Sequence, residues 1–276
     1  MHRQPLHQGV TREPAALIWL VCGTGDGPPL ATALLERGWS LRVSVVTATA
    51  ARAYAPHPRL ELAVGDLASD GQLLEQMRRS RPQWLVDATH PFAQQISARL
   101  RRVCSQAQLP LLRLQRQLPE PSPQDAPLRQ RLLADLPQLA ELDLRGERLL
   151  LAIGSRQLGE ALAHSNASAH FARILDRPGS LQLALAAGLT DGQLACVKPG
   201  GQPTSTGLEP AALETALCRR WGISSVLARQ SGGSSEALWR RTCQRLGLPL
   251  LLLRRPGPAV ADGLPLPLLL EKLGRP

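Results

Sequence analysis

A glycine-rich turn gives the first indication of chemistry in this sequence of 276 residues. The turn consists of Gly23, Thr24, Gly25, Asp26 and Gly27. It follows an apolar run, residues 16–22, that is typical of a strand buried on both faces. Glycines there let the backbone approach a pyrophosphate, which the N-terminus of the next helix stabilises. The turn predicts a dinucleotide site, although Pro28 stands at the third glycine position of G-x-G-x-x-G. The alternative is an ordinary strand–helix turn.

The residues after the predicted second strand indicate which nucleotide would bind. NAD-binding folds place an acidic residue about 20 residues beyond the turn to hold the ribose hydroxyls, and residues 45–52 contain none. The stretch carries Thr47, Thr49 and Arg52 instead, and hydroxyls with an arginine suit the 2′-phosphate of NADP. We therefore expect NADPH as the cofactor, with NADH as the second choice. In the alternative interpretation, Thr47 and Thr49 merely cap the next segment.

A polar cluster at the end of the predicted fourth strand is the third candidate. The string runs Asp87-Ala88-Thr89-His90-Pro91-Phe92-Ala93, and in open parallel sheets such strand ends face the ligand crevice. Thr89 is a candidate cofactor ligand. His90 could orient the cofactor, bind a substrate carboxylate or donate a proton. Pro91 disfavours the α conformation at His90 and can open the following helix. Alternatively, His90 is structural and Thr89 is a helix cap.

These candidates lie on an alternation of strands and helices. The first block has predicted strands at residues 16–22, 40–47, 59–64, 83–88 and 109–114. Its first predicted helix ends near Gly38, and two further helices are predicted at residues 69–80 and 92–106. The second block has predicted strands at 148–153, 171–175, 194–197, 225–228 and 249–253, and helices at 155–163, 180–187, 210–220 and 234–246. Alternation with short turns predicts right-handed crossovers and a parallel, doubly wound α/β fold.

A proline-rich stretch between the blocks divides the chain into predicted domains. Residues 1–15 are a polar, disordered tail, and residues 16–116 form a Rossmann-like NADP-binding domain. Residues 117–147 form a connection with a short helix, and residues 148–276 form a second α/β domain that binds substrate. Two parallel sheets of similar size predict an active site in the cleft between them.

Composition excludes several classes of protein. The formal net charge is +10, but aromatic residues make up 3% of the chain, and nucleic-acid binding usually needs a basic stripe or stacking aromatics. The excess positive charge suits an acidic ligand. No apolar run approaches the length of a membrane span, and the N-terminus lacks a hydrophobic signal stretch. Five cysteines without a C-x-x-C pair predict reduced thiols in the cytoplasm, and the histidines show no metal-ligand spacing.

The heptad at residues 87–93, together with the glycine turn, resembles the precorrin-6A reductase family of corrin-ring biosynthesis. That family has a G-G-T-G-E-type turn, where this chain has Cys22 to Asp26, and a D-A-T-H-P-F-A segment, which this chain repeats unchanged. Further similar segments are residues 110–116, 154–157, 229–233, 248–249 and 254–256. The chain departs from the family at Gln115, Ser155, Arg229 and Gln230, at residues 198–201, and near Trp239 in place of a family lysine.

The resemblance implies an oxidoreductase that uses NADPH to reduce precorrin-6A, or its cobalt form, to precorrin-6B. The substrate is a polycarboxylate tetrapyrrole, and guanidinium groups bind carboxylates bidentately. Candidate substrate ligands are Arg113, Arg116, Arg156, Arg229, Ser231, Gly232 and Gly233. Any one of these arginines could instead be a solvated surface residue. The presence of cobalt and the oligomeric state stay open at this point.

Two alternatives come from other classes of protein. A short-chain dehydrogenase needs a Tyr-x-x-x-Lys pair, but the single tyrosine, Tyr54, has Pro58 four residues later. A non-enzymatic NADP-binding sensor or nucleic-acid regulator would use one Rossmann half and would not need a second α/β unit with its own polar loops.

Overall fold

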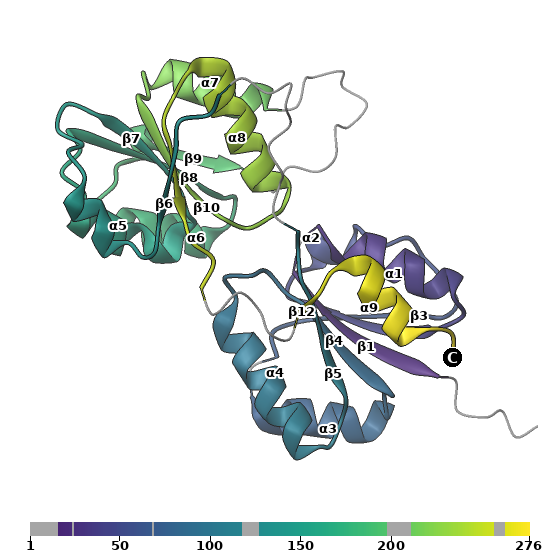
Figure 1. Ribbon diagram of the computed structural model, residues 1–276. Helices are drawn as coiled ribbons and strands as arrows, with labels where there is room; N and C mark the ends of the chain where they lie inside the picture. The colour runs from purple at the N-terminus through teal and green to yellow at the C-terminus, as the bar shows by residue number, and fades with distance from the viewer. Residues whose placement is uncertain (1–15, 24, 68, 118–126, 198–210, 257–262) are drawn as a thin grey trace, which may run out of the picture. The chain divides into compact units, whose positions relative to one another are not determined.

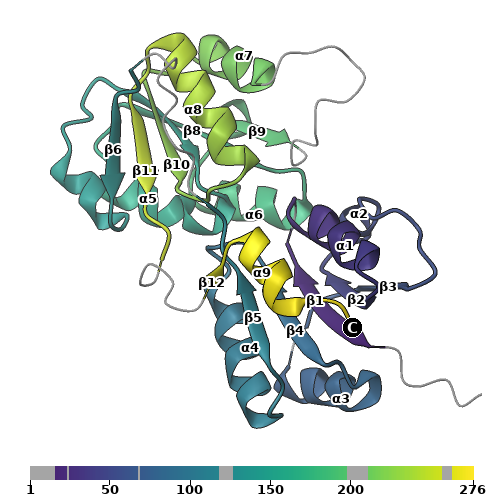
Figure 2. The same ribbon diagram turned by 45° about the vertical axis from the view of Figure 1, so that its right-hand side comes forward.

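The computed structural model describes residues 16–23, 25–67, 69–117, 127–197, 211–256 and 263–276 (Figure 1). Within this part of the chain there are two compact α/β units. The first comprises residues 16–115 and 263–276, and the second comprises residues 116–256. Each unit contains a parallel sheet of six strands with helices on both faces (Figures 1 and 2). The predicted α/β fold with two parallel sheets is confirmed.

The first sheet has the strand order β12-β5-β4-β1-β2-β3. Its strands are β1 (Leu17–Cys22), β2 (Ser40–Val45), β3 (Leu60–Val64), β4 (Trp84–Ala88), β5 (Leu111–Leu114) and β12 (Gly263–Leu264). Its helices are α1 (Gly27–Glu36), α2 (Ala48–Ala51), α3 (Asp70–Ser80), α4 (Gln94–Gln106) and α9 (Leu266–Leu273). Read from β3, this is the 3-2-1-4-5-6 order of dinucleotide-binding folds, and the order reverses between β1 and β4.

The continuous apolar run of β1 is explained by burial on both faces. Ile18 and Leu20 point into a core shared with α1 and α9. Trp19 and Val21 point into the opposite core, shared with α3 and α4. Strand residues alternate between faces, so a strand covered by helices on both sides is apolar throughout. This central strand therefore holds the glycine turn at its carboxyl end in a fixed position.

The second sheet has the order β6-β11-β10-β7-β8-β9. Its strands are β6 (Gln130–Leu133), β7 (Arg148–Ala152), β8 (Ala169–Leu175), β9 (Leu194–Val197), β10 (Ser225–Arg229) and β11 (Leu250–Leu253). Its helices are η1 (Pro137–Glu141), η2 (Ser155–Gln157), α5 (Leu158–His164), α6 (Pro178–Ala186), η3 (Asp191–Gln193), α7 (Ala212–Arg220) and α8 (Ser234–Leu246). The strand order matches that of the first sheet, with β7 in the place of β1 and β10 in the place of β4.

The structure differs from the predicted domain boundaries at both sixth strands. β6 lies within the predicted connection 117–147, yet it pairs with β11 of the second sheet. β12 lies within the predicted second domain 148–276, yet it pairs with β5 of the first sheet. The helix after β12 packs in the first core through Leu269 and Leu273. These segments are placed by long-range pairing, which a local pattern does not reveal. The predicted tail 1–15 lies outside the described residues, and the predicted cleft between the domains stays a prediction.

Candidate functional site

The glycine turn of the first unit touches the loop that follows β4. The Gly23 N–H donates to the carbonyl oxygen of Ala88 (3.4 Å). A Cβ atom on Gly23 would lie 3.3 Å from the backbone nitrogen of His90, and Gly25 has a φ of +102°. The turn and the His90 loop therefore lie together where the strand order reverses, which is the ligand crevice of this class of fold. Thr24 lies outside the described residues.

Gly27 is required by close packing at the start of α1. A Cβ atom there would overlap the hydroxyl of Tyr54 and would lie 2.9 Å from the Cys22 sulfur. In the G-x-G-x-x-G pattern, the third glycine permits close helix–strand packing. Gly27 has that role here, one position before Pro28, so the imperfect sequence match still gives a closely packed turn.

The first turn of α1 offers few donors to an anion. Pro28 and Pro29 have no N–H group, and the Leu30 N–H donates to the carbonyl oxygen of Asp26 (3.2 Å). An anion at this turn would therefore meet the backbone N–H groups of residues 25–27. The side chain of Asp26 does not cap the helix.

A buried carboxylate organises the loop after β4. Asp87 is 2% exposed. Its Oδ1 accepts hydrogen bonds from the N–H (3.0 Å) and the hydroxyl (2.7 Å) of Thr89, and its Oδ2 pairs with Arg113 Nη1 (3.0 Å). The Thr89 hydroxyl also lies 3.2 Å from the hydroxyl of buried Ser97. Arg113 is therefore first a counter-charge to Asp87, and Thr89 is fixed by the same carboxylate.

His90 is half-buried at the end of this loop. The Phe92 N–H donates to His90 Nδ1 (3.2 Å), and the two rings lie with centroids 5.8 Å apart. With Nδ1 accepting, the neutral imidazole carries its proton on Nε2. The Ala93 N–H donates to the His90 carbonyl oxygen (2.7 Å), so a turn precedes α4, which begins at Gln94 rather than at Pro91.

The segment expected to recognise the 2′-phosphate forms the short helix α2. Thr47 is its N-cap, and the Thr47 hydroxyl oxygen accepts a hydrogen bond from the Ala50 N–H (3.2 Å). The capping interpretation is therefore confirmed for Thr47, whose hydroxyl hydrogen can still be donated. Thr49 and Arg52 are exposed on the same helix and its C-cap.

In the second unit, the turn after β7 adjoins the end of β10. Gly154 has a φ of +82°, and a Cβ atom on it would lie 3.4 Å from Arg229 Nη1. Arg229 donates from Nε (3.1 Å) and Nη2 (2.7 Å) to Gln157 Oε1. Burial, together with the nearby charge of Arg156, lowers the pKa of Arg229 to about 10. Two guanidinium groups are thus held near each other, an arrangement that an anion would stabilise.

The Ser231-Gly232-Gly233 turn is surrounded by arginine side chains. Gly232 has a φ of +66°, and a Cβ atom on it would lie 2.7 Å from Arg255 Nη2. A Cβ atom on Gly233 would lie 2.7 Å from Arg116 Nη1. Both glycines are needed for this close approach. Arg255 Nη1 donates to the carbonyl oxygen of Arg116 (3.1 Å), so the two arginines are tied together beside the turn.

A buried glutamate fixes the same turn from the first turn of α8. Glu236 is 1% exposed, and its Oε2 accepts a hydrogen bond from the Gly232 N–H (2.8 Å). Its Oε1 pairs with Arg240 Nε (2.8 Å). The Ser231 side chain is also buried, and its hydroxyl oxygen accepts from the Gly233 N–H (3.4 Å). Ser231 therefore shapes the turn from inside.

The structure brings the predicted residues together in two groups, one in each unit. The first group contains Gly23, Gly25, Asp26, Gly27, Thr89, His90 and Arg113. The second contains Arg116, Arg156, Arg229, Ser231, Gly232 and Gly233. Sequence reasoning gave no role to Asp87, Gln157, Glu236 or Arg255. A signal existed for two of these residues, because Asp87 is the acid in an otherwise apolar strand, and Glu236 has the spacing of a capping residue.

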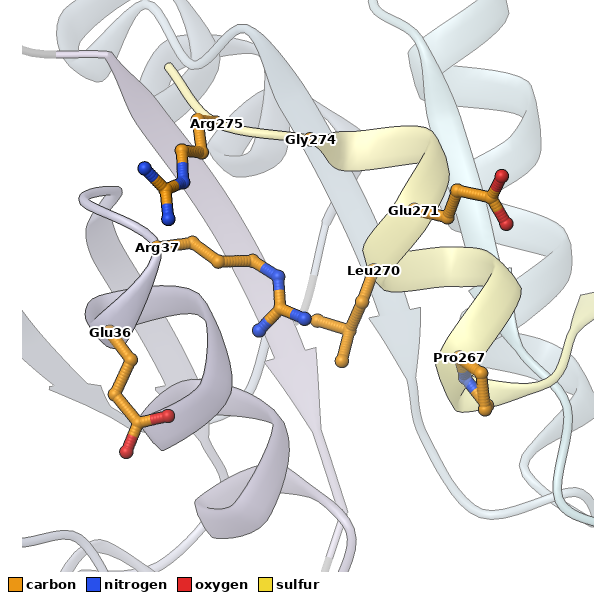
Figure 3. A pocket seen from close by; sticks show the side chains of 7 residues that line it. All are labelled: Glu36, Arg37, Pro267, Leu270, Glu271, Gly274 and Arg275. Atoms are coloured by element: carbon orange, nitrogen blue, oxygen red, sulfur yellow. The ribbon is translucent and has the colours of Figure 1, made fainter.

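Other features lie away from these groups. Figure 3 shows a hollow of about 570 Å³ lined by Glu36, Arg37, Pro267, Leu270, Glu271, Gly274 and Arg275. It adjoins the end of α1 opposite the glycine turn, so it does not belong to the candidate site. Trp239, near the place of a family lysine, is a core residue. Residues 198–201 lie outside the described part of the chain.

The described residues contain neither a helix capable of crossing a bilayer nor a cluster of ligands suited to a metal ion. The short-chain dehydrogenase alternative also fails on geometry. Tyr54 is 8% exposed and lies beneath Gly27, and burial raises the pKa of its hydroxyl. It therefore cannot serve as an accessible catalytic acid.

The fold and the polar strand ends define the chain as a two-unit parallel α/β protein with a Rossmann-like first unit. The family model for precorrin-6x reductase CbiJ/CobK matches residues 17–265, and the chain belongs to this family of oxidoreductases of cobalamin biosynthesis.

Similar proteins agree with this assignment. A cobalt-precorrin-6A reductase of Synechocystis sp. is 31% identical over 249 residues, which cover 87% of this chain and 89% of the relative. A precorrin-6A reductase of Rhodococcus erythropolis is 31% identical over 242 residues, with the same coverage. A solved structure described as CobK precorrin-6A reductase has the same fold, with a TM-score of 0.71 at 24% identity, covering 94% of this chain and 98% of that chain.

Proposed function

We propose that this protein catalyses the NADPH-dependent reduction of precorrin-6A, or its cobalt form, to the corresponding precorrin-6B. Family membership and the names of two relatives, which cover most of this chain, support the substrate class. The proposed compartment is the cytoplasm, and free thiols at all five cysteines support a reducing environment.

The observation that carries the proposal is the contact between the glycine turn and the His90 loop at the reversal of strand order. Gly27 leaves no room for a Cβ atom, a Cβ atom on Gly23 would be tight against His90 (3.3 Å), and Gly25 has a positive φ, so the backbone is shaped for close approach. These residues fit a dinucleotide pyrophosphate. When bound there, a reduced nicotinamide supplies the hydride for the reaction.

The short helix α2 supports a preference for NADPH over NADH. Thr49 and Arg52 are exposed on it, and the hydroxyl of Thr47 lies at its start. These residues follow β2, which is the place where a nucleotide-binding fold recognises the ribose. Arg52 is proposed to bind the 2′-phosphate through charge-assisted hydrogen bonds.

His90 is proposed to act as a neutral hydrogen-bond donor that orients the bound cofactor or substrate. Protonation of Nδ1 would place two donors against each other, because the Phe92 N–H already points at that nitrogen. The contact therefore favours the Nε2–H imidazole over an imidazolium acid. Of the three roles expected for His90, orientation agrees best with this geometry.

The arginines of the second unit are proposed to bind substrate carboxylates. Arg156 and Arg229 lie near each other at the end of β7 and β10, and Arg116 lies over the Gly232-Gly233 turn. A carboxylate placed between Arg156 and Arg229 would offset their mutual repulsion. Arg113 is a weaker candidate, because its guanidinium is already paired with buried Asp87.

Anaerobic incubation with enzymatically prepared precorrin-6A tests the proposal. Parallel reactions contain precorrin-6A or its cobalt form, with NADPH or NADH, and are followed by the absorbance of the macrocycle and of the nicotinamide. We expect stoichiometric oxidation of NADPH, with slower oxidation of NADH. Absence of turnover with every combination would overturn the proposal.

A further inference from the structure

Tyr54 lies at a junction between the two parts of the proposed nucleotide site. It lies three residues beyond Ala51, the last residue of α2, and its N–H donates to the carbonyl oxygen of Ala51 (3.1 Å). Its side chain is 8% exposed and reaches the start of α1, where its hydroxyl lies at the position that a Gly27 Cβ atom would occupy. One side chain therefore joins the helix that follows β2 to the glycine turn that follows β1.

The surroundings of the Tyr54 hydroxyl do not stabilise the folded state. The hydroxyl is fully buried, and within the described residues no nitrogen or oxygen makes a hydrogen bond with it. The Cys22 thiol of β1 faces the hydroxyl and offers it only a weak sulfur hydrogen bond, and burial raises the pKa of both groups, that of Cys22 to about 12. A buried hydroxyl without a strong partner destabilises a fold relative to an apolar group of the same shape. A phenylalanine would avoid this cost, so the hydroxyl calls for another explanation.

The Tyr54 side chain spans the space from the segment after α2 to the glycine turn. Thr47, Thr49 and Arg52 lie on α2 or at its ends, immediately before Tyr54. A ligand with a pyrophosphate on the turn and a 2′-phosphate on α2 must span both parts at once. Because Gly27 lacks a side chain, the phenol oxygen is in direct contact with the turn, and loss of that oxygen would let α2 move toward it.

We propose that Tyr54 is a positioning residue that determines cofactor preference by fixing the distance between the glycine turn and α2. The inference rests on the proposed function, since it requires that NADPH spans these two parts. Tyr54 does not contact the cofactor, because Gly27 covers its hydroxyl. NADH lacks the 2′-phosphate and depends on the turn alone, so its binding should not respond to this distance.

The test replaces Tyr54 by phenylalanine, which removes the oxygen and keeps the ring. Dissociation constants for NADPH and NADH are measured by fluorescence titration, and melting temperatures by calorimetry. We expect the NADPH constant to rise by about tenfold and the NADH constant to change by less than about twofold, as for a misplaced binding group. The melting temperature should stay the same or rise. Trp39→Phe is the matched control, because Trp39 is a buried aromatic residue beyond the opposite end of α1 that donates to the Gly274 carbonyl oxygen.

Each other outcome has a defined meaning. Equal weakening of NADPH and NADH, unchanged constants, or a lowered melting temperature in Tyr54→Phe would overturn the positioning role. If wild-type protein binds neither nucleotide, or binds both equally, the proposed cofactor fails before Tyr54 is considered. The same change of preference in Trp39→Phe would also contradict the proposal, because that residue does not touch the glycine turn.

Discussion

At His90, the hydrogen bond from the Phe92 N–H bears on whether the imidazole acts as a hydrogen-bond donor or as an acid that gives up its proton. An imidazolium acid loses its proton as the pH rises through neutrality, so the maximal rate would fall over that range. A neutral Nε2–H donor keeps its proton. We therefore predict that the maximal rate, measured under anaerobic conditions, does not fall between pH 6 and pH 8, because the Phe92 N–H donates to Nδ1 (3.2 Å) and leaves Nε2 as the donor.

The variant His90→Gln tests the same role by kinetics. Loss of an orienting hydrogen bond should lower the maximal rate by about tenfold and should leave NADPH affinity within about threefold of wild type. Full activity on precorrin-6A would show that His90 only packs the loop. His57→Gln is a control, since that side chain accepts a hydrogen bond from the Arg59 N–H in an exposed loop.

Cysteine reactivity reports on the burial of the site. Cys196 is exposed, whereas Cys22, Cys104, Cys218 and Cys243 are buried. Burial raises the pKa of each of these four thiols to about 12, so they carry almost no thiolate at pH 8. We predict that iodoacetamide labels Cys196 alone in the native protein and all five cysteines after denaturation, as measured by mass spectrometry. Equal native labelling at Cys22 would contradict the buried packing beneath the turn.

Arg229 is predicted to serve substrate binding. Its pKa is lowered to about 10 by burial and by the nearby charge of Arg156, so a substrate carboxylate placed there would stabilise its charge. Arg229→Gln should raise the KM for the tetrapyrrole by about tenfold or more, the scale of one charged hydrogen bond. NADPH affinity should not fall. Arg145→Gln is the control, because Arg145 pairs with exposed Asp143. An equal loss of NADPH affinity in Arg229→Gln would contradict a role for this arginine in binding the tetrapyrrole alone.

At the scale of single elements, a comparison of two glycines distinguishes the effect of backbone strain from the effect of blocking the ligand. Gly25 and Gly65 both have positive φ, +102° and +143°, and among the described residues no atom outside the chain neighbours lies within 4 Å of a Cβ on either. Valine at either position should cost about 1–3 kcal/mol in the free energy of unfolding. We predict that Gly25→Val abolishes NADPH binding, whereas Gly65→Val lowers stability without that loss. Equal nucleotide affinity of the two variants in calorimetric titration would remove the pyrophosphate from this turn.

The sequence predicted the elements that are defined by local composition. Strands such as β1 and β11 are apolar runs because they are buried on both of their faces, and this burial is visible in the sequence. β12 has two residues, and β6 is mostly exposed, so neither has a comparable pattern. Each of these two strands pairs with a strand that lies far away in the sequence, β6 with β11 and β12 with β5. Prolines also obscured α9, whose leucines are buried in the first core.

The candidate site was predictable where a motif determines it and not where tertiary contacts do. The glycine turn and the string around His90 carry their own signals. The role of Tyr54 depends on its contact with Gly27, and the role of Arg113 depends on Asp87, so both became visible only in the folded chain. Thr47 fell between these cases, because a threonine before a helix predicts a cap as well as a phosphate ligand.

At the scale of the whole molecule, each sheet takes its sixth strand from beyond its own five-strand block. Deleting residues 263–276 should therefore damage the first unit, although these residues follow the whole second unit in the sequence. The deletion removes Leu269 and Leu273 from the first core and the acceptor of the Trp39 indole N–H. Two buried leucines alone contribute about 3–6 kcal/mol, a large part of the stability of a domain.

We predict that the truncated protein loses hydrogen-exchange protection in β1 to β5 and retains it in β7 to β11. Mass spectrometry of peptic fragments measures both regions in one sample. Leu269→Ala is the milder companion and should lower stability by about 2–5 kcal/mol. Undiminished protection of β1 and β4 in the truncated protein would contradict a supporting role for the C-terminal segment.

The exchanged sixth strands also impose an order on biosynthesis. A growing chain leaves the ribosome from its N-terminus, and domains commonly fold as soon as they emerge. Here the first five strands emerge early, but their edge strand β12 and helix α9 are translated after all the strands of the second sheet. The second sheet, whose β6 is made before its other strands, can close first. The first unit therefore cannot complete its sheet until the whole second unit has been translated.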